Sequence, residues 1–140
     1  MTKIDGRRKL KVRCIVEAMS STAGEVLFSE DPIAFLQGVD PERGLISDRK
    51  SPIFSQPFVG KVLVYPNAVG SSVGAYVIYR LKKNHKAPKA IINQSSDIIT
   101  ASGCAIAGIA LYDLPDNDIS ELRNAKQIAL NATRGELILG

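Results

Sequence analysis

The sequence lacks tryptophan and contains only two cysteines and one histidine. Structural zinc sites and cubane iron–sulfur clusters usually take three or four Cys or His ligands, so this chain alone does not build such a site. Cys14 and Cys104 lie far apart within apolar segments, which favours buried free thiols over a disulfide or a redox role.

Long apolar runs are also missing. No run approaches the roughly 20 residues of a membrane span, and residues 1–8 hold no apolar stretch that could serve as a signal peptide. We therefore expect a cytoplasmic location and no membrane contact.

Positive charge is in moderate excess, with 18 Lys and Arg against 14 Asp and Glu, for a formal net charge of +4. Most of the excess lies in residues 7–13 and 80–89, and neither run is interleaved with the aromatic residues that single-strand binders use for stacking. We interpret both runs as solvated surface and expect no nucleic-acid partner. A non-catalytic basic module that binds nucleic acid or regulates another protein stays open as an alternative.

The first half of the chain has the pattern of short strands separated by turns. A length of 140 residues with 45% hydrophobic residues suits a single domain over residues 1–140 with a substantial core. Residues 37–59 are rich in turn-forming residues and are expected to form loops. Strands are predicted at residues 10–16, 25–28, 33–36 and 61–65.

The second half alternates between strands and helices. Apolar spacing predicts helices over residues 73–83 and 98–107, the second containing Gly103 and beginning after residues 94–97. With strands at 61–65, 90–92 and 109–112, these helices form a βαβαβ core of the α/β class. A short helix at 119–124 and strands at 127–132 and 136–139 complete the prediction.

The junction between the strand at 61–65 and the helix at 73–83 has the sequence Gly70-Ser71-Ser72-Val73-Gly74. A nucleophile elbow with Ser72 is disfavoured, because residues 66–70 separate the serine from its strand and His85 lies beyond the helix. A Walker phosphate loop is excluded by the missing lysine. Ser71 or Ser72 is therefore either a helix cap or part of a cradle that presents hydroxyl and backbone N–H groups to an anion.

Several segments resemble a known superfamily. In chain order, three of them resemble the serine loop, the next strand with its Ser-capped helix, and the following strand of the swivelling domain of the aconitase superfamily: residues 60–72, 89–99 and 108–111. Upstream segments resemble the small-subunit domain of the aconitase-X family: residues 24–28, 35–41 and 44–46. The resemblance covers roughly residues 10–140 and implies a swivelling β/β/α domain with additional short strands.

The family resemblance implies a hydro-lyase subunit that dehydrates (R)-5-phosphomevalonate to trans-anhydromevalonate 5-phosphate in archaeal-type mevalonate metabolism. It implies activity only with a large partner subunit, which would hold an iron–sulfur cluster whose iron acts as Lewis acid on the departing hydroxyl. A serine alkoxide removes the proton next to the carboxylate, and the matching position is Ser71. Gly70, Ser72 and Gly74 are expected to contact the substrate, and no metal is expected in this chain.

Two points stay open within this resemblance. A dehydratase for another hydroxy acid, such as a hydroxyproline, would use the same serine. Classical aconitases carry an arginine where this chain has Val73, and relatives often carry a basic residue at the position of Val69. The contact to the substrate anion is therefore unassigned among Arg43, Arg80 and a residue of the partner.

Overall fold

The computed structural model describes residues 2–4, 7–18 and 21–140, so parts of the segment 1–8 and of the predicted domain 1–140 lie outside the described residues. The described strands are β1 (Thr2–Ile4), β2 (Arg7–Lys11), β3 (Arg13–Val16), β4 (Ser21–Phe28), β5 (Val39–Asp40), β6 (Leu45–Ile46), β7 (Val62–Val64), β8 (Ala90–Asn93), β9 (Ala110–Asp113), β10 (Gln127–Asn131) and β11 (Glu136–Leu139). The described helices are α1 (Phe35–Gly38), α2 (Gly74–Lys83), α3 (Ile98–Ala107) and the 3₁₀ helix η1 (Ile119–Leu122). Within these ranges, no helix has the length and apolar character that crossing a bilayer requires.

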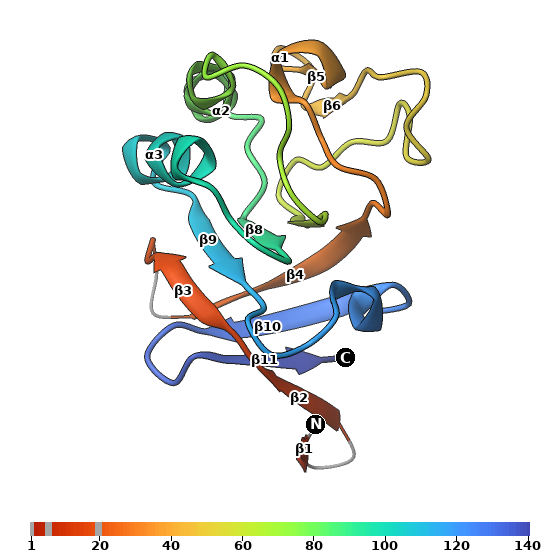
Figure 1. The fold of residues 1–140 in the computed structure, drawn as a ribbon, viewed down its shortest axis with the longest axis vertical. Helices are drawn as coiled ribbons and strands as arrows, with labels where there is room; N and C mark the ends of the chain where they lie inside the picture. Colours follow the sequence, from red (N-terminus) through yellow and green to blue (C-terminus); the bar gives the residue numbers. More distant parts are fainter. Residues whose placement is uncertain (1, 5–6, 19–20) are drawn as a thin grey trace.

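The centre of the fold is the predicted βαβαβ unit, β7-α2-β8-α3-β9. Strands β7, β8 and β9 are adjacent and parallel, with Val64 opposite Ile92 and Ile92 opposite Tyr112. Helices α2 and α3 cover the same face of these strands (Figure 1), as expected when consecutive crossovers of one hand join neighbouring strands. The prediction of this unit is confirmed.

Alternate residues of the parallel strands enter two separate cores. Leu63, Ile91 and Leu111 pack towards the helices, against side chains that include Val77, Ile78, Leu81, Cys104 and Ala107. Val62, Val64, Ala90, Ile92, Ala110 and Tyr112 pack on the other face, against residues of β2, β10 and β11 that include Leu10, Ile128, Leu130 and Leu137. The period-2 alternation of strand side chains thus produces three layers, which confirms the β/β/α swivelling fold.

The chain passes from one sheet to the other at two places. In β4, residues 21–25 pair antiparallel with β10, and residues 26–28 pair parallel with β7. On the opposite side, β2 pairs with β11 and β3 pairs with β9, and only Val12 separates these two strands. The core that lies between the two sheets, around Val64, Ile92 and Leu130, is therefore enclosed on both sides.

The structure corrects three of the strand predictions. The strand expected over residues 10–16 is divided at Val12, whose backbone N–H donates to the Gly135 carbonyl (2.9 Å) where the pairing partner changes. No strand forms over 33–36, because Ile33 makes an isolated bridge to Ala68 and the chain then turns into α1. Strand β4 begins at Ser21 rather than Glu25, since its first residues gain the antiparallel partner β10.

Helices α2 and α3 approach each other closely at Gly103. A Cβ atom on this residue would lie 3.0 Å from the Ala75 Cα and 3.1 Å from the Ala75 carbonyl oxygen, both on the backbone of α2. Glycine is therefore required here by space rather than by dihedral angle. This contact sets the separation of the two helices.

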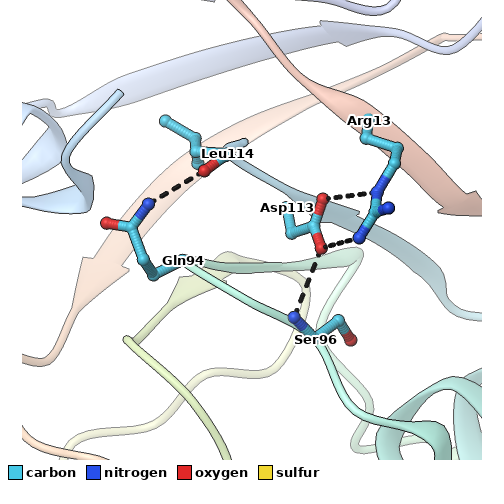
Figure 2. Close-up of polar contacts among 5 residues, drawn as sticks. All are labelled: Arg13, Gln94, Ser96, Asp113 and Leu114. Carbon is cyan, nitrogen blue, oxygen red and sulfur yellow. Dashed lines mark hydrogen bonds and ion pairs between the residues drawn. The ribbon is translucent and has the colours of Figure 1, made fainter. Parts of the chain in front are cut away.

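A buried carboxylate connects β9, β3 and the loop before α3 (Figure 2). Asp113 is only 2% exposed and accepts two hydrogen bonds from the exposed guanidinium of Arg13, at 3.0 and 2.7 Å. Asp113 Oδ2 also accepts from the Ser96 backbone N–H (3.3 Å). Nearby, the Gln94 amide donates to the Leu114 carbonyl (2.8 Å), so the loop that leads into α3 is held at two points.

We expect Gly103→Ala to destabilise the protein by about 1 kcal/mol, because the overlap with the α2 backbone outweighs the gain in helix propensity. Urea unfolding measures the change. Gly24→Ala is the matched control, since its Cβ would meet side chains no closer than 3.4 Å, and its unfolding midpoint should not fall. A Gly103→Ala protein as stable as the wild type would contradict this account of the helix contact.

We expect Arg13→Ala to lower the urea midpoint clearly more than Arg43→Ala does. Removing Arg13 leaves the buried Asp113 carboxylate without its cation, which is costly for a group shielded from water. Arg43 pairs with Asp40 at 3.2 Å on the surface, where ion pairs contribute little. Equal effects of the two substitutions would show that Asp113 does not depend on Arg13.

Candidate active site at the start of helix α2

The serine loop between β7 and α2 is held in place by backbone hydrogen bonds to the segment before α1. Ile33 N–H donates to the Asn67 carbonyl (3.2 Å), and Val69 N–H donates to the Ile33 carbonyl (3.1 Å). Gly70 follows with φ of +98°, in the region that favours glycine. The position of Ser71 is therefore fixed by the loop before the helix begins.

Ser71 forms the first turn with both its backbone and its side chain. Its carbonyl accepts from the Gly74 N–H (3.0 Å), and its hydroxyl oxygen accepts from the Val73 N–H (3.1 Å). Of the two candidate capping hydroxyls, only that of Ser71 makes a hydrogen bond among the described residues, and it caps the turn ahead of α2. Val73, at the N-cap position of α2 itself, supplies no side-chain cap.

Ser71 also lines a small cavity of about 50 Å³. The cavity lies between the serine loop, α1, α2 and the start of α3, and its lining residues are Phe35, Ala68, Val69, Gly70, Ser71, Gly74, Ile78, Asp97, Ile99 and Thr100. Gly70, Ser71 and Gly74, three of the four predicted site residues, thus come together here. Ser72 is exposed and does not line the cavity.

Backbone N–H groups are less available at this turn than the cradle hypothesis expected. Gly74 is buried and its N–H is occupied by the Ser71 carbonyl, whereas the Val73 N–H points to the Ser71 hydroxyl oxygen. One backbone donor, the Val73 N–H, is therefore directed at Ser71 Oγ. The predicted roles of Gly70, Ser72 and Gly74 in substrate contact stay predictions.

Asp97 and Thr100 bring a second helix N-terminus to the same cavity. Asp97 is the N-cap of α3, and its Oδ1 accepts from the Thr100 N–H at 2.6 Å. The sequence signals the start of this helix, with a polar Ser-Ser-Asp segment before an apolar run, but it does not signal proximity to Ser71. That proximity follows from the parallel alignment of β7 and β8, whose following loops reach the same edge of the sheet.

Two further titratable groups near the cavity are held neutral by burial. Tyr65 packs edge-on against Phe35 with ring centroids 5.9 Å apart, and burial raises the pKa of its phenol strongly. Burial, with a smaller effect of the Asp97 carboxylate, raises the pKa of the Cys104 thiol to about 12. Neither group is therefore a base or a thiolate ligand at neutral pH.

The described residues do not offer a set of ligands for an iron–sulfur cluster. Cys104 is buried and protonated, and Cys14 lies apart from it on β3. No group of three or more His, Cys, Asp or Glu residues within the described ranges could hold a metal ion. The donor set of this chain therefore does not fit the cluster implied by the family resemblance.

The arginines considered for the substrate anion lie at the other end of α2. Arg80 is about 9 Å along the helix axis from Gly74 and contacts Glu42 at 3.7 Å. Arg43 lies on the turn that the Asn84 side chain holds through the Pro41 carbonyl (2.8 Å), beside the C-terminus of α2. Neither arginine lines the cavity.

Part of the first basic run is used within the fold. Arg8 contacts Glu121 at 3.3 Å, and Lys9 forms an ion pair with Glu136, in addition to the pairing of Arg13. Three of the five basic residues of β2 and β3 are thus paired within the fold. This pairing weakens the alternative of a nucleic-acid-binding module.

A larger hollow, of about 870 Å³, lies away from Ser71 and includes Lys82, His85 and Lys89 in its lining. It adjoins the C-terminus of α2, where lysine side chains complement the partial negative charge of the helix end. His85 is exposed there, as predicted. This position leaves His85 at the opposite end of α2 from Ser71, which removes a Ser–His pair from consideration.

Curated relatives match nearly the whole chain. The phosphomevalonate dehydratase small subunit of Thermococcus gammatolerans is 44% identical over 129 residues, covering 92% of this chain and 95% of that protein. The protein of the same name from Thermococcus kodakarensis is 46% identical over 129 residues, with 92% and 94% covered.

Solved structures share the fold. The crystal structure of Thermococcus kodakaraensis aconitase X in its holo-form superposes with a TM-score of 0.84 at 43% identity, covering 95% of this chain and 99% of that one. The solution NMR structure of a UPF0107 protein gives a TM-score of 0.82 at 34% identity, with the same coverage. A family model described as the aconitase X swivel domain matches residues 9–139. On these findings, the chain belongs to the aconitase X swivel domain family.

Proposed function

We propose that this chain is the small subunit of a phosphomevalonate dehydratase and that the hydroxyl oxygen of Ser71 accepts the proton in the dehydration. The observation that carries the proposal is the position of Ser71 just before the N-terminus of α2. There it lines a cavity, and its hydroxyl oxygen accepts a hydrogen bond from the Val73 N–H. The names of the relatives support the substrate and the subunit role.

The proposed reaction removes water from (R)-5-phosphomevalonate. The proton on the carbon next to the carboxylate passes to Ser71 Oγ, the hydroxyl leaves from the adjacent carbon, and a carbon–carbon double bond forms between them. The Ser71 alkoxide becomes a hydroxyl when it takes this proton and later returns a proton to solvent, and the departing hydroxide takes up a proton to become water. The products are trans-anhydromevalonate 5-phosphate and water, and atoms and charge balance.

A serine hydroxyl is a weak acid, so its role as a base needs local stabilisation of the oxyanion. The Val73 N–H donates to Ser71 Oγ at 3.1 Å, and the N-terminus of α2 adds the positive end of a helix dipole. Burial raises the pKa of both Tyr65 and Cys104, so both side chains stay protonated. The Val73 N–H and the helix N-terminus thus both favour negative charge on Ser71 Oγ.

The proposed dehydratase needs a second subunit for two reasons: the cavity is too small for the substrate, and its lining has no cationic side chain. The cavity has room for a few water molecules, whereas a phosphorylated six-carbon acid is far larger. In addition, no lysine or arginine lines the cavity to bind the carboxylate or the phosphate. We infer that a large subunit supplies the remaining walls, the cationic contacts and the iron–sulfur cluster, for which the described part of this chain has no ligand group.

A dehydratase for another hydroxy acid, such as a hydroxyproline, is the second candidate. The same serine geometry would serve that reaction, because proton removal next to a carboxylate is common to both. Assaying the reconstituted complex with both substrates separates these candidates.

We expect Ser71→Ala to lower kcat for phosphomevalonate dehydration by about 10²–10⁴-fold in the complex reconstituted with an aconitase X large subunit, because the proton acceptor is lost. Ser47→Ala is the matched control, since Ser47 is an exposed serine directly after β6 that does not line the cavity. It should retain most of the activity. Size-exclusion chromatography checks that both variants still assemble.

Solvent exchange tests the role of Ser71 as a base more directly than turnover does. In deuterium oxide, the wild-type complex should exchange the proton next to the substrate carboxylate, and the Ser71→Ala complex should lose this exchange. If Ser71→Ala keeps full exchange and turnover while Ser72→Ala loses them, the assignment is wrong. If the wild-type complex dehydrates only a hydroxyproline, the substrate is wrong but the base is retained.

A further inference from the structure

Helix α3 has an exposed face without any charged residue. Its ten residues contain no Asp, Glu, Lys or Arg. Ile98, Ser102, Ala105 and Ile106, at i, i+4, i+7 and i+8, are all exposed and form one face, here called the α3 outer face. Ile98 is 78% exposed and Ile106 is 72% exposed, the highest values among the large hydrophobic side chains of the described residues.

The single polar side chain on the α3 outer face is used within the helix. The Ser102 hydroxyl donates to the Ile98 carbonyl at 2.7 Å, one turn earlier. Its proton is therefore not directed to solvent. The face presents two isoleucines, an alanine and an internally bonded serine over two turns of helix.

The neighbouring helix α2 has a different outer side. Val73 and Tyr76 are exposed near Ser71, but the C-terminal half of α2 carries Arg80, Lys82 and Lys83. A surface helix normally has charged residues towards solvent, as this half of α2 does. The α3 outer face instead lacks charged residues, which are also depleted from the centres of protein–protein interfaces.

The α3 outer face is continuous with the candidate active site. Ile98, its first residue, directly follows Asp97, which lines the Ser71 cavity. Val69 also lines the cavity and is 50% exposed. A chain that contacts the cavity at Asp97 therefore lies next to the residue at which the α3 outer face begins.

We propose that the α3 outer face is the docking surface for the large subunit of the dehydratase. The proposal rests on the proposed function, because it takes the occupant to be the chain that completes the site. A second copy of this chain fits less well, since an uncharged helix face packed on itself would bring neither the cationic substrate contacts nor the cluster ligands that the site lacks.

The proposal is tested with Ile106→Asp. Ile106 lies eight residues, or about 12 Å, beyond Ile98 along the helix, so its substitution is remote from Ser71. A carboxylate buried in an apolar interface without a partner is costly, so we expect the dissociation constant for the large subunit to rise at least about tenfold. Calorimetric titration of the large subunit with the purified chain measures the change.

Phe54→Asp is the matched control, because Phe54 is a 43% exposed hydrophobic residue in the loop between β6 and β7, outside both helices. It should bind the large subunit as the wild type does. Ala105→Asp provides a second substitution on the α3 outer face, and circular dichroism of each variant confirms that α3 still forms.

Three outcomes would overturn the proposal. One is unchanged affinity of folded Ile106→Asp and Ala105→Asp for the large subunit. Another is absence of binding by the wild-type chain. The third is self-association of the wild-type chain in sedimentation that Ile106→Asp abolishes without altering large-subunit affinity, which would assign the face to a second copy.

Failure of the proposed function has a different signature. If the wild-type pair associates in a manner sensitive to Ile106 but does not dehydrate phosphomevalonate, the docking surface stands and the substrate assignment falls. If the pair dehydrates phosphomevalonate and Ile106→Asp binds normally, the function stands and the docking surface falls.

Discussion

The parallel alignment of β7, β8 and β9 is the constraint on which the candidate site depends. Because the three strands run in one direction in continuous register, the loops that leave their carboxyl ends reach the same edge. One loop carries Ser71 into α2 and the next carries Asp97 into α3. The close approach at Gly103 then fixes how far apart these two helix starts lie.

The same hydrogen bond to Ser71 Oγ serves both helix capping and the proposed acid–base chemistry. A helix start leaves backbone N–H groups that need acceptors, and the Val73 N–H meets this need through Ser71 Oγ. The interaction that stabilises the turn is therefore the one that would stabilise negative charge on the oxygen. At α3 the acceptor is the Asp97 carboxylate, which already carries that charge. The two turns thus differ in their capping group, which is a hydroxyl at α2 and a carboxylate at α3.

The local sequence pattern predicts an element well where its periodicity is strong. It fails where the choice of pairing partner determines where a strand begins or ends. Helix α3 has the predicted bounds, because a polar N-terminal segment and a following Gly108 delimit an apolar run. The division at Val12 is invisible in the alternation of Leu10 and Val12, since both enter the same core while the hydrogen-bond partner changes. For the site, the glycine–serine junction was evident, and Gly70, Ser71 and Gly74 do lie together. The contribution of Asp97 and the remoteness of Arg43 and Arg80 follow from tertiary packing, which no local pattern contains.

The passage of β2 and β3 between the two sheets has a consequence for the order of folding. Strand β11, at residues 136–139, pairs with β2 at residues 8–11, so closure of the second sheet joins segments more than a hundred residues apart. Such pairing comes at a high loop-closure entropy and is typically slow. The βαβαβ unit consists of segments that follow one another in the chain, so its strands and helices can pair before β11 closes the second sheet. The serine loop between β7 and α2 can therefore be in place before the core between the two sheets is complete.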